Sequence, residues 1–270
     1  MLFGAGEGSV RIGNSRMHYV TFGKGKRDLI LFPGLGDGLA TVKGKSLPLA
    51  WMYRKYVKEY KVWVFSRKEP LEDNITTKDM AAEMKEAMDQ LNIKKASIMG
   101  VSMGGMIAQY LAVDFPERVD KLILVVSIAT PNPLVVGNLS YWIELAEKGD
   151  FETLMIDSTL RYYSSEAWKK KKWLLPLTLK AAKSKNPERF LSQAKAALYH
   201  DAYEELGKIQ APTLIIGGAK DMTVGPDASL EMAEMIRKST LYIYPEFGHA
   251  AYEEAKDFHE VVLRFLRVES

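Results

Sequence analysis

The sequence predicts an α/β protein in which a mostly parallel, eight-stranded sheet is flanked by helices. Short β-branched or fully apolar runs alternate with amphipathic helical stretches, as is typical of strands buried on both faces of such a sheet. One long stretch, residues 131–200, shows only helical patterns and interrupts this alternation. A chain of 270 residues is long enough for one large core with a modest insertion.

Eight runs are expected to form the strands. The first two flank Gly13-Asn14-Ser15, a turn sequence that predicts an opening hairpin. The later runs are separated by helical stretches, which favours parallel pairing through crossover helices. The expected strands are 9–12, 17–22, 29–32, 62–65, 96–100, 122–126, 213–217 and 241–244.

Helices are expected between the strands. Residues 76–91 place Met80, Met84 and Met88 on one face, with Thr77 as the N-cap. Further helices are expected at 103–115, 228–238 and 252–266.

The stretch 131–200 is expected to be an all-helical cap inserted after the sixth strand, and 1–130 with 201–270 to be the core domain. Asn138, Asp150 and Asn186 are expected to be N-caps within it, the last followed by a proline at the first helical position. Open α/β sheets bind ligands beyond the carboxyl ends of their strands, which is where such a cap would lie.

Composition excludes several classes of protein. The chain has no cysteine, so disulfides, a thiol nucleophile and thiolate metal sites are impossible. It shows no secretory signal pattern and no apolar run long enough to cross a bilayer, which predicts a cytoplasmic protein with no membrane partner. A net charge of +3 does not indicate a nucleic-acid partner, and the basic run 169–172 is interpreted as a solvated helix end. The four histidines form no HxH or HxxxH pair, so no metal site is expected.

The sharpest motif is Gly100-Val101-Ser102-Met103-Gly104, a G-x-S-x-G between an expected strand and an expected helix. A serine at such a tight turn has a strained backbone, and the turn lifts its hydroxyl above the sheet. The helix that follows offers its first N–H groups to a developing oxyanion. This context predicts that Ser102 is a catalytic nucleophile.

A serine nucleophile needs a base, and the base needs an acid that orients it. His249 follows the last expected strand, and Asp221 follows the strand before it. The other histidines fit worse: His18 lies in a hairpin strand, His259 lies mid-helix on an expected surface, and His200 ends a helix of the insertion. Asp227 is the alternative acid, but it precedes a helix and an N-cap role explains it.

The order of nucleophile, acid and histidine along the chain resembles that of the α/β-hydrolase superfamily, in its branch of capped esterases, C–C bond hydrolases and cofactor-free perhydrolases. The resemblance covers nearly the whole chain. It implies an oxyanion hole made by the backbone N–H groups of Leu35 and Met103. Pro33 stands where the family usually has a histidine, so that histidine's support for the oxyanion loop is absent. No metal or organic cofactor is implied.

The expected activity is hydrolysis of a small carboxylic ester through an acyl-enzyme, and the aromatic and aliphatic residues of the insertion suggest an apolar pocket. C–C bond, amide or perhydrolase chemistry would need only different pocket contacts, and peptidase activity would need carboxylates of the cap facing the pocket. A receptor that binds a small ligand without turnover is the alternative from another class. Nucleotide hydrolysis is disfavoured, because the run from Gly38 to Gly44-Lys45-Ser46 is one residue too long for a phosphate-binding loop. The sequence does not indicate an oligomeric state.

Overall fold

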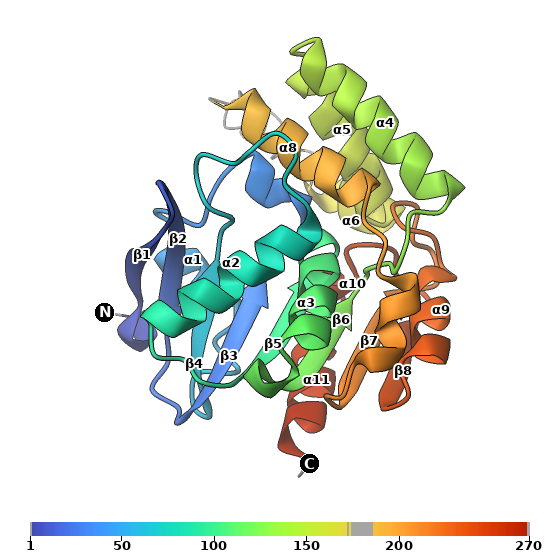
Figure 1. Cartoon of the computed structure of the whole chain (residues 1–270). Coiled ribbons are helices and arrows are strands. Elements are labelled where there is room, and N and C mark those ends of the chain that lie inside the picture. Colours follow the sequence, from blue (N-terminus) through green and yellow to red (C-terminus); the bar gives the residue numbers. More distant parts are fainter. Residues whose placement is uncertain (1, 172, 174–185, 269–270) are drawn as a thin grey trace.

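The computed structural model describes residues 2–171, 173 and 186–268. Its centre is one eight-stranded sheet with the strand order β1-β2-β4-β3-β5-β6-β7-β8 (Figure 1). The two pairings of β2, with β1 and with β4, are antiparallel, and the remaining five pairings are parallel. The predicted fold class is confirmed, since each expected strand lies within or overlaps an observed one.

The strands differ in burial as their positions in the sheet require. Every residue of β5 and of β7 is buried, because helices cover both faces of the sheet there. The edge strand β8 is mostly half-buried. The strands are β1 (Gly6–Ile12), β2 (Ser15–Phe22), β3 (Arg27–Phe32), β4 (Tyr60–Phe65), β5 (Ala96–Val101), β6 (Val119–Val125), β7 (Thr213–Gly218) and β8 (Ser239–Tyr244).

Two hydrophobic clusters fill the two faces of the sheet. One contains the buried residues of α2 (Thr77–Gln90), α3 (Met103–Asp114) and α9 (Ala228–Met235). The other contains those of α1 (Ser46–Met52), α10 (Ala251–Glu254) and α11 (Phe258–Arg267). Short 3-10 helices are η1 (Leu2–Gly4), η2 (Leu35–Gly38), η3 (Pro116–Arg118) and η5 (Tyr203–Lys208).

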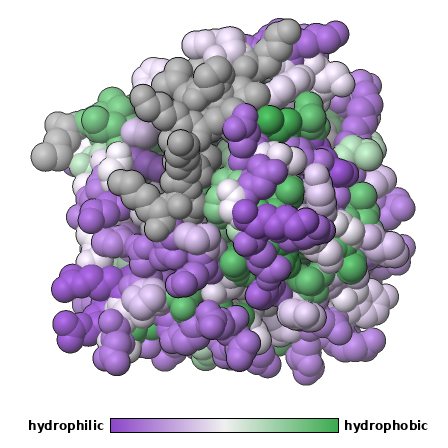
Figure 2. All heavy atoms as spheres, turned by 90° about the horizontal axis from the view of Figure 1, so that it is seen from above, coloured by the Kyte–Doolittle hydropathy of each residue, from purple (hydrophilic) through white to green (hydrophobic). Residues whose placement is uncertain are grey.

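A helical insertion separates β6 from β7. It comprises α4 (Pro133–Glu147), α5 (Phe151–Tyr162), α6 (Ser165–Lys171) and α8 (Pro187–Leu198). These helices lie beyond the carboxyl ends of the central strands (Figure 1), and α8 packs against both α4 and η2. On the surface seen from above the insertion, hydrophobic residues are interspersed among hydrophilic ones (Figure 2). The basic run 169–172 falls partly outside the described residues.

Several expected helix ends need correction. Thr76, not Thr77, caps α2, and it forms a reciprocal capping box with Asp79. Asn132, not Asn138, caps α4, because a proline at the first helical position moves its start six residues earlier. Asp150 and Asn186 do cap α5 and α8.

The expected C-terminal helix 252–266 is two helices. α10 ends at Glu254, and α11 begins at Phe258 after a break at residues 255–257. The break lets Phe258 turn into the core, where it is fully buried. Among the residues described, no helix is both long and apolar enough to cross a membrane.

Candidate active site

Ser102 lies at the turn between β5 and α3, with backbone angles of φ 53° and ψ −122°. A positive φ is unfavourable for a residue with a side chain, so the turn is held by its surroundings. The Ser102 N–H donates to the Val125 carbonyl at 2.8 Å, and the Ser102 carbonyl accepts from the Ser127 hydroxyl at 2.9 Å. Val125 ends β6 and Ser127 follows it, so this segment stabilises the strained turn.

The glycines of the motif are required by close backbone contacts. A Cβ at Gly104 would lie 2.0 Å from the Phe32 carbonyl oxygen, and one at Gly100 would lie 2.4 Å from the Gly104 carbonyl oxygen. Neither contact can be relieved by moving a flexible side chain. The first turn of α3 thus packs directly on the end of β3, which brings Ser102 beside the loop that follows β3.

Asp221 and His249 form a buried pair at the ends of β7 and β8. The His249 Nδ1 and the Asp221 Oδ2 lie 2.8 Å apart, and both side chains are almost fully buried. The other carboxylate oxygen, Oδ1, accepts the N–H groups of Thr223 at 2.8 Å and Val224 at 3.0 Å. Asp221 is thereby fixed by its own loop and is free to orient the imidazole.

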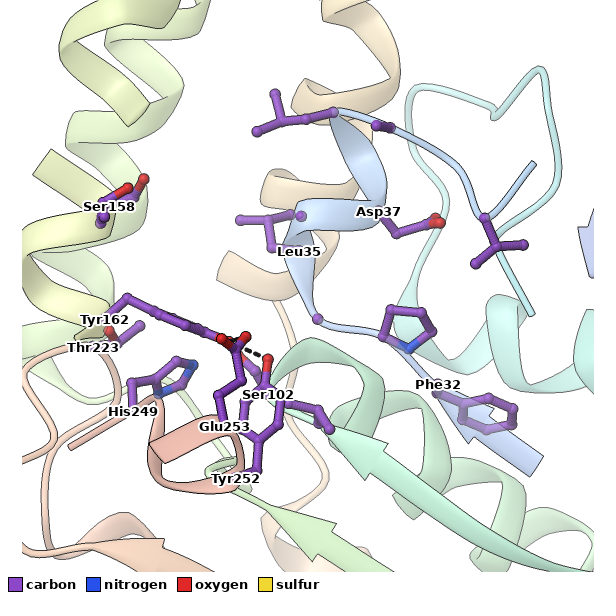
Figure 3. A pocket seen from close by; sticks show the side chains of 18 of the residues that line it. Phe32, Leu35, Asp37, Ser102, Ser158, Tyr162, Thr223, His249, Tyr252 and Glu253 are labelled. Atoms are coloured by element: carbon purple, nitrogen blue, oxygen red, sulfur yellow. Dashed lines mark hydrogen bonds between the residues drawn. The ribbon is translucent and has the colours of Figure 1, made fainter. Parts of the chain in front are cut away.

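The tautomer of His249 follows from this pair. A carboxylate only accepts hydrogen bonds, so Nδ1 carries the hydrogen and Nε2 is left as an acceptor. Ser102 and His249 line the same cavity, of about 600 Å³, although no hydrogen bond joins these two described side chains directly. Figure 3 shows them in that cavity, with Leu35 on the loop above Ser102.

The predicted oxyanion donors lie on two different elements. Leu35 begins η2 and Met103 begins α3. Within the described part of the chain, neither backbone N–H donates a hydrogen bond to another group. A Cβ at Gly34 would lie 3.4 Å from the Ser102 Cβ, so the loop and the serine are in contact range. The structure therefore brings all five predicted site residues to one cavity or its immediate border.

Two buried arginines hold the loop that lacks the family's histidine. Arg189 of α8 donates to the Asp37 carboxylate at 2.6 Å and to the Asp37 carbonyl at 2.5 Å. Arg67, after β4, donates its backbone N–H to the same carboxylate at 3.1 Å and a guanidinium N–H to the Gly34 carbonyl at 3.4 Å. Two distant segments of the chain therefore hold this loop.

This cluster is electrostatically demanding because it is buried. Burial alone would raise the pKa of Asp37, but the guanidinium groups of Arg189 and Arg67 outweigh burial and hold that pKa below its ordinary value. Burial lowers the pKa of Arg67 to about 10, which still leaves it charged at neutral pH. Removing the carboxylate would leave two buried cations without a counter-charge.

The insertion contacts the catalytic histidine through Tyr162, at the end of α5. Its ring packs edge-on to the His249 ring with centroids 5.5 Å apart, and its carbonyl accepts the Ala250 N–H at 2.9 Å. Its hydroxyl bonds to the Tyr252 hydroxyl and donates to Glu253 at 2.9 Å. Burial raises the pKa of Tyr162 well above its ordinary value, so this phenol stays protonated.

The remaining histidines have structural surroundings. His200 is buried and bonds to Thr77 at 2.8 Å and Gln109 at 3.2 Å, and burial lowers its pKa to about 3. His259 is not on an open surface as expected: it is half-buried, bonds to Tyr56 at 2.9 Å, and burial lowers its pKa to about 4. His18 lies in β2, as expected.

Two other expectations concern carboxylates. Asp227 stands at the N-cap position of α9, but its side chain makes no capping bond and is exposed.

At Gly44-Lys45-Ser46, the Glu7 carboxylate accepts the N–H groups of Gly44 at 2.9 Å and Ser46 at 3.2 Å. The backbone N–H groups that a bound phosphate would need are therefore already bonded to a carboxylate. Among the described residues, no cluster of three His, Asp or Glu side chains could hold a metal ion.

The comparison with protein families decides the classification. The family model described as the alpha/beta hydrolase fold matches residues 64–256. The chain belongs to this family. It is a hydrolase of this fold, and the predicted resemblance is confirmed at that level.

The proteins that this chain resembles carry the names of different hydrolases. The chain is 28% identical to a 2-hydroxy-6-oxononadienedioate/2-hydroxy-6-oxononatrienedioate hydrolase of Klebsiella pneumoniae, over 93% of this chain and 91% of that protein. It superposes on the enol-lactonase of Burkholderia xenovorans with a TM-score of 0.84 and 20% identity, over 97% and 100% of the two chains. It superposes on a meta-cleavage product hydrolase of Pseudomonas fluorescens with a TM-score of 0.77 and 23% identity, over 96% and 97%. At these identities the two structures show the fold alone.

Sequence reasoning did not find several residues at the site. Arg67 and Arg189 belong to no recognisable motif. Asp37 lies in the predicted oxyanion loop. The pattern around Lys45 resembles only a phosphate-binding loop, which has a different function. The available signal was a charged residue at a position where the surrounding pattern predicts burial. Its role becomes clear only from the three-dimensional contacts.

Proposed function

We propose that the protein is a serine hydrolase that cleaves a small carboxylic ester through an acyl-enzyme, with Ser102 as nucleophile, His249 as base and Asp221 as the orienting acid. The observation that supports this best is the buried Asp221–His249 pair, whose histidine lines the same cavity as a serine in strained geometry. A buried carboxylate hydrogen-bonded to a histidine is the arrangement that orients a general base for a serine nucleophile.

In the proposed reaction, Ser102 Oγ attacks the ester carbonyl carbon while His249 Nε2 accepts the serine proton. The N–H groups of Leu35 and Met103 stabilise the oxyanion. His249 then donates its proton to the leaving alcohol, which departs and leaves Ser102 acylated. Water attacks the acyl-enzyme by the same proton path, and the acid is released. Every group in these steps belongs to the chain itself.

We further propose that residues 131–200 act as a cap that shapes the substrate site over a core of 1–130 and 201–270. Residues of α4, α5 and α8 line the cavity together with the loop after β3. Most of the lining is aliphatic or aromatic, including Trp142, Leu154 and Met155. This lining supports a substrate with an apolar acyl or alcohol part.

Hydrolysis of p-nitrophenyl acetate and butyrate, by the wild type and Ser102→Ala, tests the proposal. We expect turnover in the wild type and a loss of about three orders of magnitude or more in the variant. Wild-type turnover that survives in Ser102→Ala at a similar rate would contradict the assignment of the nucleophile.

C–C bond hydrolysis is a second candidate, favoured by the Klebsiella relative. It would use the same three residues on a ketone instead of an ester. Incubating the protein with 2-hydroxy-6-oxononadienedioate and measuring its disappearance decides between them. A kcat/KM for this compound well above that for any small ester would make C–C cleavage the principal activity.

A further inference from the structure

The wall of the cavity formed by residues 36–45 carries charges that the proposed acyl transfer does not use. Asp37 and Lys45 both line the cavity there. Figure 3 shows Asp37 on this loop, on the far side of Leu35 from His249. Among the described residues that line the cavity, Glu253 is the only other Asp, Glu, Lys or Arg.

The balance of charge at this wall is positive. The Asp37 carboxylate is already bound by the buried Arg189 and lies 3.7 Å from the Arg67 guanidinium. Lys45 adds a third cation close enough to Asp37 and Arg189 to interact electrostatically with both. Asp37 therefore faces three cations, and the Glu7 carboxylate on the N–H groups of Gly44 and Ser46 still leaves an excess of positive charge. In a largely apolar cavity such an excess attracts anions strongly, because little solvent screens it.

Lys45 is the cation of the three that is open to the cavity. The side chains of Arg67 and Arg189 are only 4% and 3% exposed and do not line it. Lys45 is half-buried, and its Nζ donates to the Ala40 carbonyl at 2.9 Å. Among the described residues no carboxylate lies within ion-pair distance of Lys45. An ammonium has three donors, so at least one remains for a ligand.

Glu253 does not neutralise Lys45. Its two oxygens accept the Tyr162 hydroxyl at 2.9 Å and the Tyr163 hydroxyl at 2.7 Å. It lies on the His249 side of the cavity, near Tyr252 (Figure 3). Asp37, by contrast, lies on the far side of Leu35 from His249 and Glu253 (Figure 3).

We propose that Lys45 binds a carboxylate carried by the acyl part of the substrate, at the end remote from the bond that is cleaved. We choose the acyl part because Lys45 lines the same cavity as Leu35, whose backbone N–H is proposed to hold the carbonyl oxygen. Val42, Leu49 and Tyr53 also line this cavity and offer apolar surface to a methylene chain. This inference rests on the proposed serine hydrolase and adds the substrate class: half-esters of dicarboxylic acids, or ketones bearing such a carboxylate.

The test compares two esters that differ in one charge. Mono-p-nitrophenyl glutarate and p-nitrophenyl valerate have the same leaving group and five-carbon acyl chains. We measure the ratio of their kcat/KM values in the wild type, in Lys45→Met, and in Lys43→Met as the control, since Lys43 is exposed. We expect the glutarate-to-valerate ratio to fall on the order of tenfold or more in Lys45→Met, mainly through KM, and to be unchanged in Lys43→Met. An unchanged ratio in Lys45→Met would overturn the proposal.

A second measurement separates this inference from the proposed ester hydrolysis. Free glutarate is expected to slow the labelling of Ser102 by a fluorophosphonate in the wild type, but not in Lys45→Met, whereas valeramide slows both equally. If neither ester is turned over but glutarate still protects in this way, the anion site stands and ester hydrolysis fails. If glutarate and valeramide act alike in the wild type, the anion site is wrong even where esters are hydrolysed.

Discussion

The two walls of the cavity are built in different ways. On one wall, Ser102, Asp221 and His249 each stand just beyond the end of a parallel strand, and backbone contacts fix their positions. On the other wall, the loop with Asp37 and Lys45 is held by the side chains of Arg67 and Arg189, which lie 30 and 152 residues away from Asp37. The first wall is set by local chain geometry, and the second by long-range charge pairs.

This difference explains which wall of the cavity can be predicted from the sequence. A strand followed by a glycine-framed turn and a helix is a local pattern, so the first wall is readable along the chain. A buried pair of arginines around one aspartate has no local pattern, because its members meet only after the sheet and the insertion are assembled. The following predictions test whether the two walls really depend on these separate causes.

The largest effect is expected from Asp221→Asn on the first wall. The amide cannot stabilise the imidazolium and favours the wrong tautomer of His249, so kcat should fall by about 10³–10⁴-fold. Asp227→Asn is the matched control, because Asp227 is exposed and makes no capping bond. Steady-state ester hydrolysis measures both. Equal losses in the two variants would show that the acid has been misassigned.

Asp37→Asn is expected to have the largest effect on the second wall. It leaves Arg67 and Arg189 buried without a counter-charge and should lower the free energy of unfolding by about 3–5 kcal/mol. Asp73→Asn is the control, since Asp73 is exposed and should change stability by less than about 0.5 kcal/mol. Urea unfolding at pH 7 gives both values.

The pH dependence of this effect has a definite sign. The folded-state pKa of Asp37 is held below its ordinary value. Its contribution is therefore complete above the pKa of an unfolded aspartate, about 3.9, and is lost as pH falls through the folded pKa. The difference between wild type and Asp37→Asn should shrink below about pH 4. A difference that grows on acidification would contradict the pairing.

Gly104→Ala tests the backbone contacts of the first wall. The added Cβ would lie 2.0 Å from the Phe32 carbonyl oxygen, so we expect a loss of about 3 kcal/mol of stability or more. Gly36→Ala is the control on the second wall, where a Cβ would meet nothing within 4 Å. Thermal unfolding of the two variants measures the contrast, and similar midpoints would refute the close packing.

The smallest effect is expected from Tyr162→Phe. The variant keeps the ring against His249 but loses the hydroxyl bonds to Tyr252 and Glu253, which should cost about 1 kcal/mol. Tyr141→Phe, at a residue that is 40% exposed, is the control. Urea unfolding compares them. No difference between the two would mean that the hydroxyl bonds of Tyr162 to Tyr252 and Glu253 add no stability.

Most of the fold could be predicted from the sequence, because buried parallel strands are short apolar runs between glycines and helices. The three residues proposed as catalytic lie beyond strand ends, where the sequence indicates, and their roles stay a prediction. The predicted helix start was wrong where two neighbouring residues could both act as the N-cap, as with Thr76 and Thr77. The joint between α10 and α11 was missed, because residues on both sides of it share one helical pattern. Arg189 and Lys45 could not be assigned, because their surroundings come from other segments.

The most direct test of the proposed nucleophile is covalent labelling. The purified wild type is treated with a fluorophosphonate, and the modified peptide is identified by mass spectrometry beside Ser102→Ala and His249→Ala. The account predicts one adduct, on Ser102, that is absent from Ser102→Ala and forms far more slowly in His249→Ala. An adduct on another residue, or labelling of Ser102 at an unchanged rate without His249, would contradict it.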